Sequence, residues 1–287
     1  MNAMETLFVG PSNCSLKIRE FVMKNIQEQY NYYVHDLGDP RVKNWYMLAT
    51  PIPTVIIIII YLFLIYKFLP QLMRQRKQYK LTTLVRFYNL FQIISCTLLV
   101  YQLATPLSNP SYVWKCERFE YSRNPLALKR VSLSYYFYLI KVAEMVETVF
   151  FMLRKKNNQV SSLHVYHHVT TLITAWISGK YFSGGMVAFC MILNSFVHIL
   201  MYSYYFLSSL GLHWQKYIAK WKPAITMLQM IQLITLVVHA SQVLYFDDCN
   251  LPRIFFYFYA LNVTIIFFMF KNFFKENYFQ NTLKKVS

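Results

Sequence analysis

Residues 160–177, VSSLHVYHHVTTLITAWI, form a largely apolar stretch that is long enough to cross a lipid bilayer and yet contains three histidines. At helical spacing, His164, His167 and His168 occupy positions i, i+3 and i+4, so their imidazoles project from one face within an arc of about 100°. Ionisable side chains at membrane depth are costly and usually mark a functional site. The stretch therefore predicts a transmembrane helix with one polar, functional face.

The composition of the whole chain is typical of a membrane protein. Of its 287 residues, 56% are hydrophobic and only 14% are charged, which is unusual for a water-soluble domain of this size. The formal net charge of +17 is compatible with nucleic-acid binding, but the basic residues cluster in short segments between apolar runs. We therefore expect no nucleic-acid partner, and we attribute the charge to the positive-inside rule.

Seven apolar runs are long enough to span a bilayer. They cover residues 51–70, 84–104, 132–153, 160–178, 184–207, 223–245 and 254–273. We expect an all-α, polytopic membrane domain over residues 51–273, between an N-terminal tail (1–50) and a C-terminal tail (274–287). Apart from the N-terminal tail, the segments after the odd-numbered spans hold about twice as many Lys and Arg residues as the segments on the other side. This asymmetry places the C-terminus in the cytosol and the N-terminus in the lumen.

Three details agree with this topology. Asn13 begins a glycosylation sequon in the lumenal tail. Lys284 and Lys285, near the C-terminus, resemble the dilysine retrieval signal of endoplasmic reticulum membrane proteins. Cys116 and Cys249 both fall in lumenal loops, an oxidising compartment in which a disulfide persists. We expect these two cysteines to pair, and the alternative is two free loop thiols.

Three further spans carry polar residues at helical spacing. In the third span these are Lys141, Glu144 and Thr148, with Glu147 about 60° further around the helix. In the fifth and sixth spans they are His198, Met201, Tyr202 and Tyr205, and Thr226, Gln229 and Gln232. Polar residues often only bond one helix to another, but histidines, carboxylates and a lysine are costly at this depth unless they are paired or line a wet cavity. We expect one interior site, with Lys141 and Glu144 paired across a helical turn.

The residue types in this site allow more than one chemistry. Histidine transfers protons near neutral pH, and a neutral imidazole also attacks an activated acyl group. A metal site is the alternative, because helical bundles hold iron or zinc with His at i and i+3 or i+4 near Glu. Membrane di-iron desaturases and hydroxylases use more histidines than the five that lie in spans, at 164, 167, 168, 198 and 239. We assign no residue as a metal ligand, although a single metal stays open. A transporter is disfavoured because the chain shows no repeat.

Four ordered segments resemble the signatures of the very-long-chain fatty acid elongase family. They read KVAEMVET at 141–148, HVYHH at 164–168, HILMYSYY at 198–205 and TMLQMIQ at 226–232. Further likenesses are DPRV at 39–42, YN at 88–89 and LRKKN at 153–157, so the resemblance covers nearly the whole chain. One difference is Glu147, because the family usually has Asp at this position.

This resemblance implies a 3-oxoacyl-CoA synthase of the endoplasmic reticulum membrane, with seven transmembrane helices, six of them around an acyl tunnel. Such an enzyme condenses a long-chain acyl-CoA with malonyl-CoA and releases carbon dioxide and free CoA. No cofactor besides the two substrates is implied. Other enzymes of the elongation cycle are implied as partners, and a homodimer is compatible with the resemblance.

Residue roles follow from the same resemblance. We expect His167 to accept the acyl group as an acyl-imidazole, His198 to lie opposite it, and His164 and His168 to orient this pair or line the malonyl site. The candidates for substrate binding are Lys141, Glu144, Glu147, Thr148, Met201, Tyr202, Tyr205, Gln229 and Gln232. The predicted topology adds candidates for the CoA phosphates, which favour Lys and Arg and arrive from the cytosol: Arg154, Lys155, Lys156, Lys271 and Lys275. The alternative is that these residues are ordinary positive-inside charges. In the alternative mechanism, histidine acts only as base and hydrogen-bond donor while the two thioesters react directly.

Overall fold

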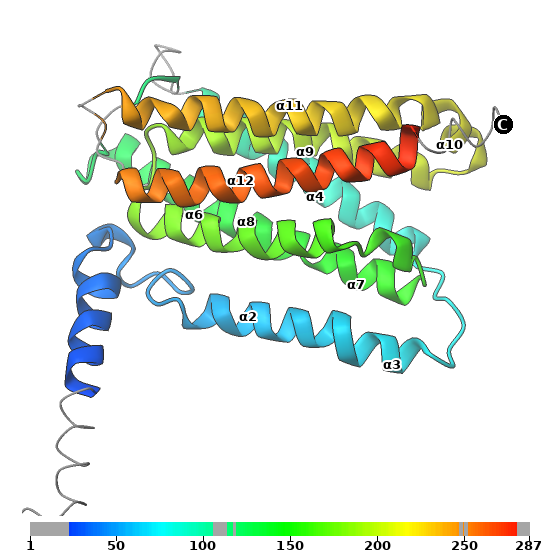
Figure 1. Ribbon diagram of the computed structural model, residues 1–287, viewed down its shortest axis with the longest axis horizontal. Helices are drawn as coiled ribbons and strands as arrows, with labels where there is room; N and C mark the ends of the chain where they lie inside the picture. Colours follow the sequence, from blue (N-terminus) through cyan, green and yellow to red (C-terminus); the bar gives the residue numbers. More distant parts are fainter. Residues whose placement is uncertain (1–22, 106–113, 117–118, 247–248, 250–251, 280–287) are drawn as a thin grey trace, which may run out of the picture.

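The computed structural model describes residues 23–105, 114–116, 119–246, 249 and 252–279. Within these ranges the regular secondary structure is helical, and no strand is present. The long helices lie side by side along a common direction (Figure 1). The predicted glycosylation site Asn13 and the lysines of the predicted retrieval signal, Lys284 and Lys285, lie outside the described residues.

Each predicted span overlaps a helical segment. The first is α2 (Ile52–Phe63), which continues through η3 (Leu64–Phe68) into α3 (Leu69–Met73). Next come α4 (Thr82–Ala104), α6 (Pro125–Glu144) with α7 (Val146–Leu153), α8 (Ser162–Tyr181) and α9 (Val187–Ser209). The sixth segment begins with α10 (Leu212–Ile218) and η5 (Ala219–Trp221) and continues through α11 (Lys222–Ala240) into η6 (Ser241–Leu244). The seventh is α12 (Arg253–Phe274), which continues into η7 (Lys275–Phe279).

Five helices are long and apolar enough to cross a membrane. They cover Ile52–Met73, Thr82–Ala104, Val187–Ser209, Leu212–Leu244 and Arg253–Tyr278. The chain is therefore a multi-pass, all-α membrane protein. The remaining two predicted spans, α6 with α7 and α8, are also long helices, but they carry the buried charges and the histidine run, which lower their hydropathy. Seven crossings remain a prediction.

Two helices contain irregular turns with a local cause or consequence. Pro70 has no N–H to donate, and the first helix passes through the π-helical turn η3 immediately before it. Between α6 and α7, the N–H of Met145 bonds to the carbonyl oxygen of Val142 at 3.3 Å. This tight turn separates Glu144 from Glu147, so the two carboxylates of the third span stand on opposite sides of an interruption in the helix.

Part of the predicted N-terminal tail is fixed to one end of the bundle, the end that is predicted to be lumenal. Asp39 and Arg41 form an ion pair at 2.6 Å in which both side chains are buried. A guanidinium nitrogen of Arg41 donates to the carbonyl oxygen of Ser122 at 3.0 Å. The Lys180 ammonium at the end of α8 donates to the carbonyl oxygen of Ala49 at 3.1 Å. These contacts connect the segment before α2 with α6 and α8.

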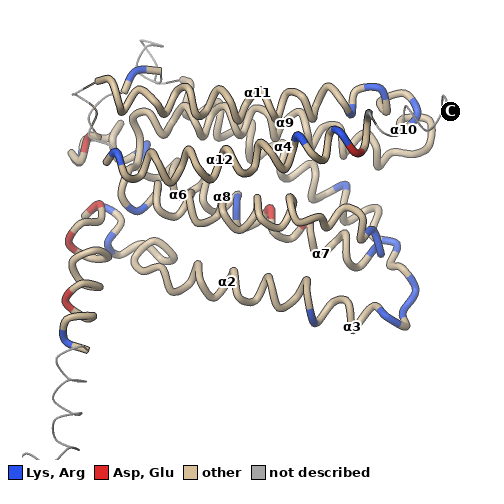
Figure 2. Tube along the Cα trace, in the orientation of Figure 1, with Lys and Arg blue, Asp and Glu red and all other residues tan. Residues whose placement is uncertain are grey.

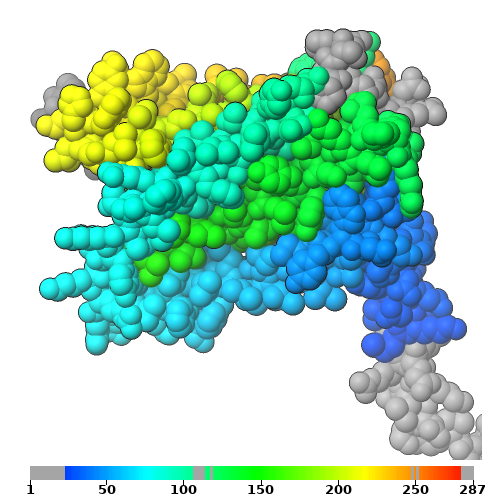
Figure 3. Space-filling model, turned by 180° about the vertical axis from the view of Figure 1, so that it is seen from behind, coloured from blue at the N-terminus to red at the C-terminus, as the bar shows by residue number. Residues whose placement is uncertain are grey.

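Charges gather at the two ends of the bundle, with few in between (Figure 2). On the rear face, α4 crosses diagonally between the N-terminal helices and the α10–α11 region (Figure 3), and it packs along α9. The charge distribution is the one expected for helices whose middle parts face lipid and whose ends face water. Only the third span carries described acidic residues near mid-bundle.

Cys116 and Cys249 form a disulfide, with Cα atoms 5.3 Å apart. Cys116 lies between α4 and α6, and Cys249 lies between α11 and α12, so the bond joins two connections that are 133 residues apart in the sequence. The alternative of two free thiols does not hold in this structure. Cys96, on α4, is a buried free cysteine.

Loss of this disulfide should lower thermal stability. We expect Cys116→Ala to reduce the free energy of unfolding by about 2 kcal/mol, the low end for native disulfides, because membrane-embedded helices already restrict the unfolded chain. The measurement is the melting temperature of detergent-purified protein with and without reductant. Reductant should lower the melting temperature of the native protein and of the control Cys96→Ala, but not that of Cys116→Ala. A native protein insensitive to reductant would contradict the prediction.

Candidate active site

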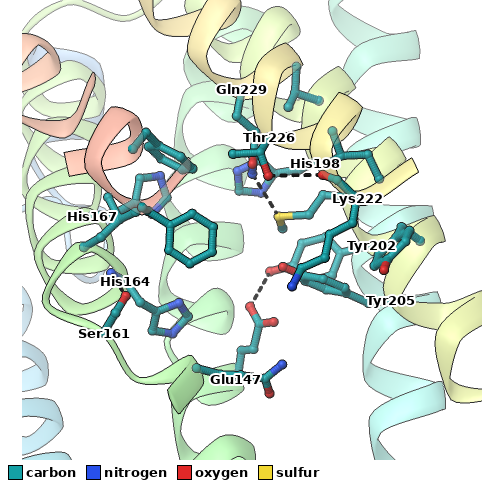
Figure 4. A pocket seen from close by; sticks show the side chains of 18 of the residues that line it. Glu147, Ser161, His164, His167, His198, Tyr202, Tyr205, Lys222, Thr226 and Gln229 are labelled. Carbon is teal, nitrogen blue, oxygen red and sulfur yellow. Dashed lines mark hydrogen bonds between the residues drawn. The ribbon is translucent and has the colours of Figure 1, made fainter. Parts of the chain in front are cut away.

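A cavity of about 390 Å³, the central cavity, lies among α7, α8, α9, α11 and α12 (Figure 4). It contains ten of the residues that the sequence predicted to be functional: Glu147, His164, His167, His168, His198, Met201, Tyr202, Tyr205, Gln229 and Gln232. Ser208 and Lys222 also line it, and both lie at the ends of their helices that are predicted to be cytosolic. Predicted polar residues of α8, α9 and α11 thus meet Glu147 of α7 in one cavity, which extends to the end of the bundle predicted to be cytosolic. Lys141 lines a different cavity, and Glu144 and Thr148 line none of the cavities described.

Four histidines converge on this cavity from α8 and α9. The Ser161 hydroxyl caps α8 by accepting a hydrogen bond from the His164 backbone N–H at 3.2 Å, so the histidine run occupies the first turns of the helix. The rings of His164 and His168 have centroids 4.3 Å apart, and those of His167 and His198 have centroids 6.3 Å apart. His198 therefore lies opposite His167, as the sequence predicted.

A buried group of charges supports His198. The Lys141 ammonium donates to Oε1 of Glu144 at 2.7 Å, and Nδ1 of His198 lies 2.9 Å from the same oxygen. Glu144 is fully buried, and Lys141 is only 2% exposed. The predicted pairing of Lys141 with Glu144 is thus present. Glu144 lines none of the cavities described, and its contacts position a histidine from behind.

A second set of contacts ties α7 to its neighbours. The Tyr202 hydroxyl donates to Oε2 of Glu147 at 3.4 Å. The Thr148 hydroxyl is hydrogen-bonded to Nε2 of His164 at 2.8 Å and to the Tyr61 hydroxyl at 2.9 Å. Thr148 is fully buried between these partners, so the structure places it behind the cavity wall instead of on its surface.

An apolar cavity of about 120 Å³ continues from the central cavity toward the end of the bundle that is predicted to be lumenal. The two cavities share His167, Asn194, Gln232 and Leu233. Beyond these four residues, the apolar cavity runs past Ala175 to Met186, Ala240 and Phe255. His167 therefore lies where the polar central cavity meets the apolar cavity.

A third cavity of about 180 Å³, the side cavity, meets the central cavity at Glu147 and Tyr205. Of the predicted CoA-phosphate candidates, Arg154 and Lys156 line it. The other three candidates, Lys155, Lys271 and Lys275, are exposed and line none of the three cavities. The structure therefore separates the cationic candidates into two groups.

Asn194 and Lys222 are among the lining residues of the central cavity that sequence reasoning missed. Asn194 lies one helical turn before His198, a spacing that places it on the same face of α9. Its Oδ1 atom is buried and has no hydrogen-bond partner among the described residues. Lys222 was counted only as a cytosolic cation, but it lies at the first position of α11 and its side chain extends into the cavity (Figure 4).

His239 lies apart from the other four intramembrane histidines. It is fully buried, and its ring stacks on Phe189 with centroids 4.2 Å apart. It lines none of the cavities described. Across the described part of the chain, no three His, Cys, Asp or Glu side chains are arranged to hold a metal ion.

A multi-pass helical protein with paired histidines between a polar and an apolar cavity has the features of a membrane enzyme that acts on acyl chains. The sequence profile of the GNS1/SUR4 (ELO) family matches residues 46–286. This chain belongs to that family, the fatty acid elongases.

Curated relatives agree with the family assignment. The chain is 35% identical to a very long chain fatty acid elongase of Aedes aegypti, over 90% of this chain and 71% of the relative. It is 36% identical to very long chain fatty acid elongase 7 of Rattus norvegicus, over 77% of this chain and 78% of the relative. It is 34% identical to very long chain fatty acid elongase 4 of Homo sapiens, over 87% of this chain and 79% of the relative.

Proposed function

We propose that this protein is a very-long-chain 3-oxoacyl-CoA synthase, which condenses a long-chain acyl-CoA with malonyl-CoA to a 3-oxoacyl-CoA two carbons longer. The observation that carries this proposal is the place of His167, at the boundary between the central cavity and the apolar cavity. An acyl chain in the apolar cavity puts its thioester carbonyl beside His167. Its CoA then extends through the central cavity toward Lys222 and the cytosol.

In the first half-reaction, an imidazole nitrogen of His167 attacks the thioester carbonyl carbon. The carbon–sulfur bond breaks, CoA leaves as the thiol with the imidazole proton, and the acyl group stays on His167. The amides of Asn194 and Gln232 line the same two cavities as His167 and can donate hydrogen bonds to the oxyanion of the tetrahedral intermediate.

In the second half-reaction, malonyl-CoA loses carbon dioxide, and the resulting enolate attacks the acyl carbon. The carbon–nitrogen bond to His167 breaks, and the imidazole takes up a proton. We assign the relay of this proton to His198, whose Nε2 takes it up from solvent in the central cavity and passes it to His167. Because Glu144 lies 2.9 Å from Nδ1, it favours the tautomer with hydrogen on that atom and directs Nε2 toward the cavity.

The cellular setting is part of the proposal. We propose an endoplasmic reticulum location with a lumenal N-terminus and a cytosolic C-terminus, supported by the charge asymmetry of the loops and by a disulfide at the predicted lumenal end. We propose no cofactor besides the two thioesters. The 3-oxo product is a substrate for the reducing and dehydrating enzymes of the elongation cycle, and partnership with them and a homodimer stay proposals.

The function is tested in microsomes from cells that express the chain. Labelled malonyl-CoA is supplied with acyl-CoAs of increasing length, and the label should appear in an acyl product two carbons longer. The matched control is His198→Ala, which should give no such product at an equal expression level. Absence of label from every elongated product with the native chain would contradict the proposed function.

The apolar cavity should limit the length of the acyl chain. Ala240, on α11, is 4% exposed and lines this cavity. We expect Ala240→Phe to fill the cavity and to shift the preferred acyl-CoA to shorter chains, measured as relative kcat/KM across the acyl-CoA series. Val238→Phe, on the exposed side of the same helix, is the matched control and should leave the preference unchanged. Equal effects of both substitutions would contradict the assignment.

A further inference from the structure

The side cavity reaches the reaction centre from a different direction than the central cavity. Its walls come from α4, α7, α9 and α10, whereas α8, α11 and α12 line the central cavity but not the side cavity. The two cavities share Glu147, Phe151, Gln159, Tyr205 and Ser208. The histidines are therefore approached from the cytosolic end by two routes that join beside Glu147.

The outer part of the side cavity is cationic. Arg154 follows the last residue of α7 and is half-buried, and Lys156 lies two residues further on. Among the described residues, neither side chain has an acidic partner, and burial together with the charge of Arg154 lowers the pKa of Lys156. Cations that are held together without a counter-ion favour an anionic ligand, and Arg suits phosphate groups in particular.

The inner part of the side cavity holds a neutral donor without an acceptor. Asn89, on α4, is 2% exposed and lines the cavity, and its Nδ2 atom has no hydrogen-bond partner within the described part of the chain. The Arg86 guanidinium donates to the carbonyl oxygen of Ser209 at 2.7 Å and thereby joins α4 to the end of α9 beside the cavity. An amide carbonyl of a pantetheine arm matches the donor that Asn89 offers.

Continuity of the cavities decides which substrate each route receives. The apolar cavity shares four residues with the central cavity and none with the side cavity. A substrate whose chain lies in the apolar cavity must therefore extend through the central cavity, past Lys222. The side cavity suits a thioester whose acyl group is short and needs no apolar space, and malonyl-CoA has this chemistry.

We propose that the side cavity binds malonyl-CoA, with Arg154 and Lys156 at its phosphates, while acyl-CoA binds through the central cavity at Lys222. This assignment rests on the condensation function proposed above. It gives each thioester its own cationic group and its own path to the histidines. Both substrates then reach His167 without exchanging places in one channel.

Steady-state kinetics of two matched variants test this division. We expect Arg154→Gln to raise the KM for malonyl-CoA about tenfold to a hundredfold and to leave the KM for acyl-CoA unchanged, since a charge-assisted hydrogen bond is lost on one substrate. Lys222→Gln should raise the KM for acyl-CoA and leave the KM for malonyl-CoA unchanged. Arg154→Lys should restore part of the malonyl-CoA affinity. Lys77→Gln, an exposed cytosolic cation outside the three cavities, is the control for a general charge effect.

Two outcomes would overturn the division of routes. If each variant raises both KM values, the substrates share one route, and if Arg154→Gln changes neither, the side cavity does not hold the phosphates. The folding of Arg154→Gln protein is judged by its size-exclusion profile and melting temperature. If it does not fold, Asn89→Leu is the second variant, and it should raise the KM for malonyl-CoA alone. Failure of the condensation function itself is distinguishable, because the native protein would then be inactive before any variant is compared.

Discussion

Purified protein that is incubated with acyl-CoA alone should gain the mass of one acyl chain and release an equal amount of free CoA, whereas His167→Ala protein should do neither. The reason is the position of His167 at the boundary of the two cavities, where it is the one nucleophilic side chain among the four residues that they share. In the complete reaction, we expect His167→Ala to lose activity by a factor on the order of a thousand or more. Intact-protein mass spectrometry and a thiol assay provide the two readouts.

The control for this experiment is His213→Ala, because His213 lies on α10 and is exposed to solvent. It should retain both the mass gain and the release of CoA. If the native protein releases CoA only when malonyl-CoA is also present, and no acylated protein is found, the two thioesters react directly in a ternary complex. That result would replace the covalent route and leave the condensation function in place.

Removal of the Glu144 carboxylate should have the largest effect on stability. Glu144→Gln leaves the buried Lys141 ammonium without a counter-ion, and breaking a buried ion pair in this way costs about 3–5 kcal/mol. We expect a large drop in the melting temperature of the detergent-purified protein, or loss of folded protein. The measurement is a thermal denaturation curve of the variant beside that of the native chain.

A double substitution separates charge from structure at this position. Lys141→Met with Glu144→Gln removes both charges and should recover most of the lost thermal stability, because no uncompensated charge remains. It should not recover activity, because His198 has still lost the carboxylate that lies 2.9 Å from its Nδ1. A melting temperature of Glu144→Gln equal to that of the native protein would contradict the prediction.

Much of the fold follows from local patterns in the sequence. The helices coincide with the apolar runs because a chain in lipid must satisfy its backbone hydrogen bonds internally. Helical spacing also predicted that His164, His167 and His168 share one face, and the structure places all three in the central cavity. The pairing of Lys141 with Glu144 was accessible for the same reason, because both lie on one helix.

Contacts between helices were less accessible. The Tyr61 hydroxyl bonds to Thr148 across 87 residues, and the Thr54 hydroxyl, seven residues earlier on the same face of α2, bonds to Tyr138. The spacing of these two residues in α2 indicates a common face but not the helix that it contacts. Helical periodicity gives the face of a residue but not the neighbouring helix, so Thr148 was predicted to bind substrate although it lies behind the cavity wall. The cytosolic cations all obey the positive-inside rule, and only the packing of the helices distinguishes Lys222 and Arg154 from Lys271.

The contacts at the predicted lumenal end affect how the bundle opens. The disulfide, the buried pair of Asp39 and Arg41, and the Lys180 contact all lie there. At the cytosolic end, the described residues form neither a disulfide nor a buried ion pair. Local unfolding begins where such links are fewest, so backbone amides at the cytosolic ends of the helices should exchange with deuterium before those at the lumenal ends. A bulky thioester can then be admitted by fraying of one end while the far end remains sealed.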